Sequence, residues 1–156
     1  MSKRRVVVTG LGTINPLGNN VFDTWNNLIN GISGVDYISS FETDELPVTF
    51  AGEVKNFDAN DYMGKQHARK LDRSGHLSIY ATEEALKDAG FNTEERLGAD
   101  VGIVFGTGIG GIGATEEAVR TYDKRGPSRI NPLAITQLMP NSVSYTHLTL
   151  PTILLV

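Results

Sequence analysis

Residues 101–113, with the sequence VGIVFGTGIGGIG, contain the pattern that decides the fold of this 156-residue chain. The first five residues are mostly β-branched or aromatic, glycines follow at once, and helix-forming residues come next. This order predicts a buried strand, a tight loop and a helix. The spacing of Gly106, Gly108 and Gly111 also fits G-x-G-x-x-G, so a dinucleotide-binding loop is one interpretation of the stretch.

The chain begins with a similar step from a strand to glycines. Residues 5–9 predict a first strand, and the two glycines after it are expected to end the strand in a turn. Apolar residues at helical spacing predict an amphipathic helix over residues 20–30, with Asn20 as its N-cap and Trp25 as a core anchor.

Helices dominate the pattern between the two strand-to-glycine steps. A short polar helix is predicted over residues 65–73, followed by a longer one over residues 74–90 whose Glu84 and Asp88 are expected to face water. A further helix is expected to begin near residue 130, with Pro132 in its first turn. The alternation of strands and helices predicts an α/β fold with a largely parallel sheet.

Composition limits the classes of function. The chain has 40% hydrophobic and 21% charged residues, a mean hydropathy of −0.16, a net charge of −4 and a pI near 5.3, as expected of one ordinary soluble domain. An acidic chain argues against general nucleic-acid binding, which uses a basic face. No stretch approaches the ~20 apolar residues of a membrane span, and we expect a cytoplasmic protein.

The chain contains no cysteine, which removes disulfides, thiolate metal sites and cysteine nucleophiles together. Its three histidines, His67, His76 and His147, lack a metal-ligand spacing. We therefore expect neither a metal site nor a cofactor.

A local group of cations stands out on this acidic chain. Lys65, Arg69 and Arg73 are spaced at i, i+4 and i+8, which would place them on one face of the predicted helix, with Lys70 beside them. Such a stripe suits docking of an acidic partner. The alternative is a solvated helix face whose charges are balanced by Asp72.

Several separated motifs resemble one family. The chain resembles the β-ketoacyl-[acyl-carrier-protein] synthase II family, elongating condensing enzymes of the thiolase fold, from Met1 to Asn141. Residues 142–156 do not continue the family pattern, and we interpret them as a non-native tail, with a divergent native end as the alternative. The motifs are MSKRRVVVTGLG at residues 1–12, PLGN at 16–19, FAG at 50–52, RKLD at 69–72 and GTGIGG at 106–111.

The resemblance implies the N-terminal half of a thiolase-like α/β/α/β/α subunit that assembles as a homodimer. The family performs a decarboxylative Claisen condensation in fatty acid biosynthesis, using a nucleophilic cysteine and two histidines that lie beyond the region matched here. These three catalytic residues are absent from the sequence given, so the chain is expected to be inactive by itself.

The resemblance also implies binding residues. Lys65, Arg69 and Lys70, and with them Arg73, fall where the family docks acyl-carrier protein. Four residues correspond to the acyl-chain pocket, and two of these belong to a segment that approaches the pocket of the dimer partner. The pocket residues are Gly108, Ile109, Leu133 and Ala134, the last two being the ones near the partner.

Two other functions remain as alternatives. One is a non-catalytic module for carrier-protein docking or dimerisation, in which the glycine loop is only structural. The other is a dinucleotide-binding domain, against which stands the lack of an acidic residue about 20 residues after the loop, where residues 126–128 read Gly-Pro-Ser.

Overall fold

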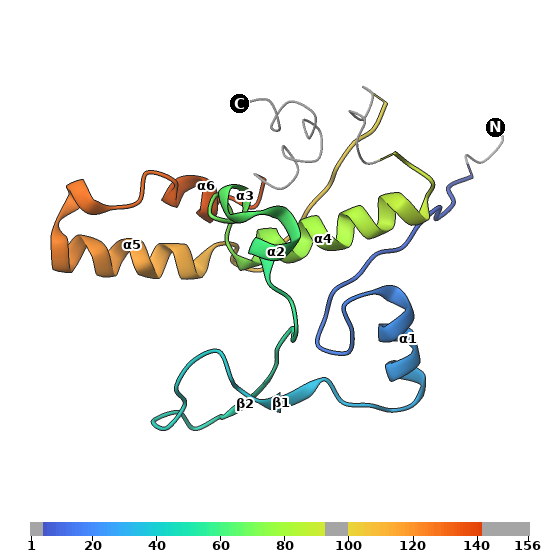
Figure 1. Ribbon diagram of the computed structural model, residues 1–156, viewed down its shortest axis with the longest axis horizontal. Coiled ribbons are helices and arrows are strands. Elements are labelled where there is room, and N and C mark those ends of the chain that lie inside the picture. Colours follow the sequence, from blue (N-terminus) through green and yellow to red (C-terminus); the bar gives the residue numbers. More distant parts are fainter. Residues whose placement is uncertain (1–4, 93–99, 142–156) are drawn as a thin grey trace. The chain divides into compact units, whose positions relative to one another are not determined.

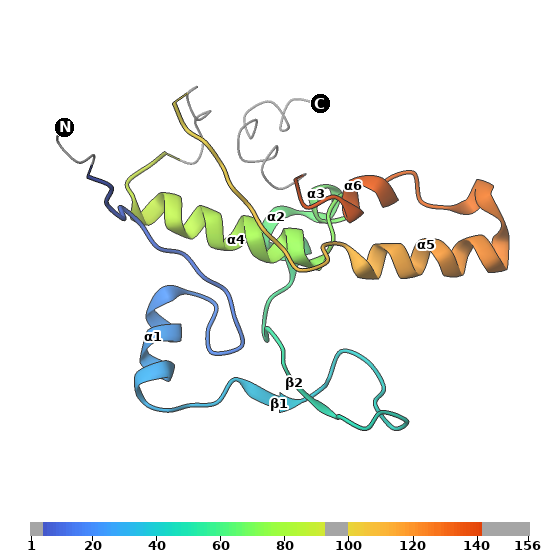
Figure 2. The same cartoon turned by 180° about the vertical axis from the view of Figure 1, so that it is seen from behind.

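The computed structural model describes residues 5–92 and 100–141 (Figures 1 and 2). The chain divides into two compact units, Met1–Phe57 with Tyr80–Asn92 and Asp58–Ile79 with Thr93–Val156. The longest described helix, α4 (Arg73–Asp88), contributes its first half to the second unit and its second half to the first. Within the described part of the chain, no helix has the length and apolar character needed to cross a membrane.

In the first unit, helix α1 (Val21–Ile29) follows the N-cap residue Asn20, whose side-chain oxygen accepts the backbone N–H of Asp23 at 2.7 Å. The predictions of this helix and of its cap are confirmed. The interpretation of Trp25 as a core anchor is wrong for this chain, since the side chain is 59% exposed. The two strands β1 (Val35–Tyr37) and β2 (Phe50–Gly52) form an antiparallel pair.

The N-terminal segment lies against α4 rather than in a sheet. A Cβ atom on Gly10 would be 2.3 Å from the carbonyl oxygen of Ala85, and one on Gly12 would be 2.0 Å from that of Ala81. These glycines therefore permit close backbone packing, and the prediction that they form a turn is wrong. The turn comes later, where Asn15 and Gly18 exchange backbone hydrogen bonds of 3.0 and 3.1 Å.

Two carboxylates of α4 hold this segment. The backbone N–H groups of Thr13 and Val21 donate to Glu84 at 2.8 and 2.9 Å, and that of Leu11 donates to Asp88 at 2.8 Å. The expectation that Glu84 and Asp88 only face water is wrong, because backbone donors without a strand partner require other acceptors. Glu84 thereby joins α4 to the first residue of α1 as well.

The described part of the second unit consists of helices and the loops between them. It contains α2 (Ala59–Met63), α3 (Lys65–Ala68), α5 (Ile112–Arg125), the 3₁₀ helix η1 (Pro127–Arg129) and α6 (Ala134–Leu138). Its core contains Leu71 and Ile79, with Met63 and Phe105 packed against them. The helix expected after the glycine loop is confirmed as α5. The next helix begins at Ala134, later than predicted.

The largely parallel sheet is not present in the described residues. Residues 5–9 and 101–105 have no ladder partner there, and the described sheet is the antiparallel pair β1–β2. A strand exists only where a neighbouring backbone completes its hydrogen bonds. Without such a neighbour the apolar runs stay open to solvent, with Val6 87% exposed and Val104 fully exposed. The chain is thus a partial α/β fragment.

One further carboxylate organises the segment between β1 and β2. Glu53 accepts hydrogen bonds from both the backbone N–H and the hydroxyl of Ser39, each at 2.8 Å, and from the same two groups of Ser40. These bonds, that from the Ser40 hydroxyl being the most important, lower the pKa of Glu53 from 4.5 to about 2.

We predict that Glu84→Gln destabilises the first unit, because the amide replaces one of the two carboxylate acceptors by a donor that faces a backbone N–H. The expected loss is about 1–3 kcal/mol in the free energy of unfolding, measured as a lower urea midpoint. Lys87→Gln, on the exposed side of the same helix, is the control and should change the midpoint little. Equal midpoints for Glu84→Gln and wild type would contradict the role of Glu84.

We also predict an acid-dependent loosening of the segment between β1 and β2. Because the folded pKa of Glu53, about 2, lies below its usual 4.5, the stabilisation is complete above pH 4.5 and is lost as the pH falls towards 2. The amide chemical shifts of Ser39 and Ser40 should titrate with a midpoint near 2. Glu53→Gln should abolish this titration and Glu42→Gln should not, whereas a wild-type midpoint near 4.5 would refute the prediction.

Candidate functional site

The four cations singled out in the sequence lie around a turn rather than on one helix face. We call Lys65, Arg69, Lys70 and Arg73 the basic turn. Helix α3 ends at Ala68, and α4 begins only at Arg73. The prediction of a single helix over residues 65–73 is therefore wrong. The structure still brings the four residues together, since they span the end of one helix, a turn and the start of the next.

The physical reason for the break is the burial of Leu71. Its side chain is 9% exposed and packs with Ile79 in the core of the second unit. The turn that directs it inward is closed by backbone bonds of 3.0 Å from Lys70 to His67 and 3.1 Å from Leu71 to Ala68. The spacing of the cations does not predict the break between α3 and α4, because the break depends on the burial of Leu71.

Most of the charge on the basic turn faces solvent. Lys65, Arg69 and Arg73 are exposed and Lys70 is half-buried. Within residues 5–92 and 100–141, Lys65, Arg69 and Lys70 form no ion pair with Asp72 or with any other carboxylate. The pKa of Asp58 is lowered, mainly by hydrogen bonds from Asn60 and to a smaller extent by the charge of Arg73.

Side chains from two other helices hold the backbone of the turn. His76 Nε2 lies 2.7 Å from the carbonyl oxygen of Ala68, and since a carbonyl only accepts, this nitrogen carries the proton. Gln137 Nε2 donates to the carbonyl oxygen of Arg69 at 2.8 Å. Neither contact was expected from the sequence. His76 lies eight residues after Ala68 and Gln137 lies 68 residues after Arg69, and neither separation is a spacing that signals such a bond.

The glycine loop packs against α6. A Cβ on Gly111 would lie 2.2 Å from the carbonyl oxygen of Gln137, and Gly110 has φ +82°. The amides at the end of the loop have acceptors within the protein: Gly110 donates to the Thr107 hydroxyl at 3.2 Å, Gly111 to the carbonyl of Leu138 at 3.4 Å and Ile112 to the carbonyl of Gly110 at 2.8 Å. A dinucleotide loop directs such amides at a pyrophosphate, so this arrangement disfavours that interpretation.

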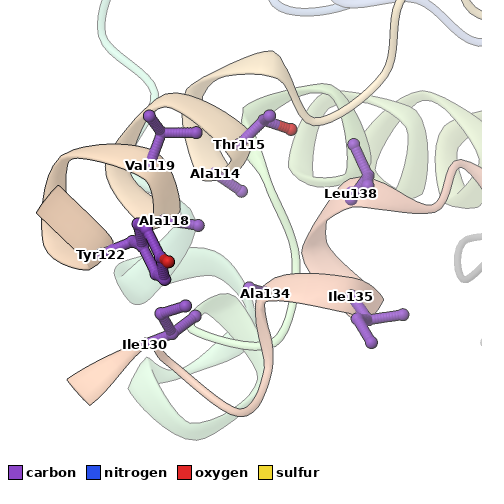
Figure 3. A pocket seen from close by; sticks show the side chains of 9 residues that line it. All are labelled: Ala114, Thr115, Ala118, Val119, Tyr122, Ile130, Ala134, Ile135 and Leu138. Atoms are coloured by element: carbon purple, nitrogen blue, oxygen red, sulfur yellow. The ribbon is translucent and has the colours of Figure 1, made fainter. Parts of the chain in front are cut away.

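An apolar groove of about 310 Å³ lies between α5 on one side and Ile130 and α6 on the other (Figure 3). Of the four residues expected in an acyl-chain pocket, Ala134 lines this groove and Leu133, Gly108 and Ile109 do not. Ile109 is 72% exposed on the glycine loop. Only one of the four residues thus lines this groove. The groove is lined by Ala114, Thr115, Ala118, Val119, Tyr122, Ile130, Ala134, Ile135 and Leu138.

Catalytic and metal-ligating groups were not expected in this chain. Within the part that the structure describes, no group of three or more His, Asp or Glu side chains is arranged to hold a metal ion. His147 and the rest of the proposed tail, residues 142–156, lie outside the described residues.

Sequence comparison relates this chain to condensing enzymes. The family described as "Beta-ketoacyl synthase, N-terminal domain" matches residues 3–148. The 3-oxoacyl-[acyl-carrier-protein] synthase 2 of Staphylococcus aureus is 38% identical over 138 residues, which cover 88% of this chain and 33% of the relative. The enzyme of the same name from a Synechocystis species is 37% identical over 144 residues, 92% of this chain and 35% of the relative. The chain spans about a third of the length of these relatives.

Solved structures of ketosynthases have the same fold over this region. The ishigamide ketosynthase/chain length factor matches with a TM-score of 0.82 at 24% identity, over 96% of this chain and 37% of that one. A type II polyketide synthase ketosynthase in complex with its acyl-carrier protein and bound to the hexaketide matches with a TM-score of 0.74 at 28% identity, over 95% of this chain and 39% of that one.

We predict that Gly111→Ala destabilises the second unit, because the added Cβ would lie 2.2 Å from the carbonyl oxygen of Gln137 and must displace α6. The expected cost is roughly 1–3 kcal/mol in the free energy of unfolding. Gly113→Ala is the matched control: Gly113 is the second residue of α5, a Cβ there would lie 3.6 Å from Oδ1 of Asp72, an ordinary contact distance, and the change should be neutral or stabilising. Equal urea midpoints for the two variants would contradict this packing.

Proposed function

Because this chain belongs to the β-ketoacyl synthase N-terminal domain family, we propose that it provides the carrier-docking and pocket-lining part of a β-ketoacyl-[acyl-carrier-protein] synthase. Its homologues are 3-oxoacyl-[acyl-carrier-protein] synthases, which are acyltransferases of fatty acid synthesis. In the proposal, residues 5–9 and 101–105 gain strand partners in the complete thiolase-like subunit and complete a largely parallel sheet there.

The basic turn is the observation that carries the docking proposal. Acyl-carrier proteins are acidic, and an acidic chain with net charge −4 attracts such a partner only through a local positive patch. Lys65 and Arg69 are exposed and, like Lys70, have no ion pair within the described residues, so their charge is available to a partner. One ketosynthase of related structure was solved with its acyl-carrier protein, which makes the same kind of partner reasonable here.

The acyl-chain pocket and the dimer belong to the same proposal. Gly108 and Ile109 would border the acyl chain from the glycine loop, where Ile109 is 72% exposed and open to a partner surface. Leu133 and Ala134 would approach the pocket of a second subunit in a homodimer. The apolar groove beside Ala134 supports this, because such a surface is stable in water only when covered.

Condensation itself requires a nucleophile that this sequence lacks. Covalent catalysis in the family depends on a thiolate, and there is no cysteine among the 156 residues. We therefore propose that this polypeptide alone forms no acyl-enzyme. The alternative is a non-catalytic fragment that only docks a carrier protein or dimerises, and it uses the same basic turn.

Binding of holo-acyl-carrier protein and of NAD, each measured by calorimetry, tests this function. We expect the chain to bind the carrier protein with an affinity that falls as salt rises, and not to bind NAD. Changing Lys65, Arg69 and Lys70 to Gln together should weaken carrier binding by about threefold to 150-fold, since three charge pairs at roughly 0.2–1 kcal/mol each sum to about 0.6–3 kcal/mol.

Arg120→Gln is the control for this experiment, because Arg120 lies on α5 and is already paired with Glu116. It should leave carrier binding unchanged. Binding of NAD without binding of the carrier protein would overturn the proposed function and favour the dinucleotide interpretation.

A further inference from the structure

The side-chain amide of Gln137 is held at both of its ends. Asn131 Nδ2 donates to Gln137 Oε1 at 3.3 Å, and Gln137 Nε2 donates to the carbonyl oxygen of Arg69 at 2.8 Å. Asn131 is itself oriented, because its Oδ1 accepts the backbone N–H of Leu133 at 3.0 Å. The carbonyl of Arg69 can only accept, so the partners fix which end of the Gln137 amide faces the turn.

The hydrogen bond from Gln137 to the carbonyl of Arg69 lies within the basic turn. Arg69 caps the C-terminal end of α3, where backbone carbonyls have no partner within the helix. Of these carbonyls, that of Ala68 is bonded by His76 and that of Arg69 by Gln137. The side chains of Arg69 and Lys70 therefore project from a backbone fixed on two sides.

The main chain of Gln137 contacts the glycine loop. Its carbonyl oxygen occupies the space that a Cβ on Gly111 would need, and the next residue, Leu138, accepts the N–H of Gly111 at 3.4 Å. One residue of α6 thus contacts the basic turn through its side chain and the glycine loop through its backbone. α3 and α6 lie side by side in both views (Figures 1 and 2).

We propose that Gln137 is a positioning residue for carrier-protein docking, which fixes the backbone of the basic turn so that Arg69 and Lys70 meet an acidic partner in a set orientation. This inference rests on the proposed function. Its physical basis is preorganisation, since a fixed turn loses less conformational entropy when the partner binds.

Gln137→Met tests the proposal, because methionine has similar length and helix propensity, adds no charge and forms neither hydrogen bond. We expect it to weaken binding of holo-acyl-carrier protein roughly three- to tenfold, as the loss of the hydrogen bond between Gln137 and the carbonyl of Arg69 implies. The control is Thr136→Ala, which removes a hydroxyl that donates to the carbonyl oxygen of Leu133 in the same segment. It should leave binding unchanged.

A double-mutant cycle separates positioning from general destabilisation. In a background with Arg69→Gln and Lys70→Gln, Gln137→Met should have almost no further effect on carrier binding. An equal loss in both backgrounds, or no loss in wild type, would overturn the proposal.

Hydrogen exchange at the amides of Lys70 and Leu71 gives a readout that needs no partner. Gln137→Met should accelerate exchange at both, since their bonds close the turn. Unchanged exchange would refute the positioning role itself. If exchange accelerates but wild type does not bind the carrier protein, the proposed function fails and the role in docking fails with it, while the structural contact stands.

Discussion

Gly10 and Gly12 lie so close to α4 that any side chain at either position would overlap a carbonyl oxygen of the helix. The second unit uses the same constraint, with Gly111 against the backbone of α6. In both units a glycine segment contacts a helix directly. Beside this contact, the side chains of Glu84 and Asp88 accept backbone N–H groups in the first unit, and the carbonyl oxygen of Leu138 accepts the N–H of Gly111 in the second. Close backbone packing is therefore what the local structure of each unit depends on.

Many large apolar side chains of the described residues lie outside the core and are exposed to solvent. The described core contains only Ala59, Ala68, Leu71 and Ile79, whereas Phe22, Trp25 and Leu28 on α1 are more than half exposed. Burial of apolar area is the main stabilising contribution to folding, at about 25 cal/mol per Å². The chain spans about a third of the length of its relatives, and in the proposed complete subunit these apolar side chains would be covered.

The basic turn shows how charge and packing cooperate. Leu71 is buried, and Arg69 and Lys70 directly precede it in the sequence. Hydrogen bonds from His76 and Gln137 hold the backbone carbonyls of Ala68 and Arg69. Exposed charges on a mobile segment lose orientation and are screened by salt. Anchoring the turn through backbone carbonyls leaves the cationic groups themselves available, which is the arrangement that docking of an acidic protein requires.

The sequence alone determined the family, the helix after the glycine loop, α1 with its Asn20 cap, and the presence of a basic group at residues 65–73, because local spacing and motif order carry these features. It could not determine where the polar helix ends, which depends on burial of Leu71, nor that Glu84 and Gln137 bond distant backbone groups. The predicted strands at residues 5–9 and 101–105 have the expected residues but no ladder partner in the described chain. Only tertiary structure decides such features, because a hydrogen bond needs a partner that the periodicity of one segment does not specify.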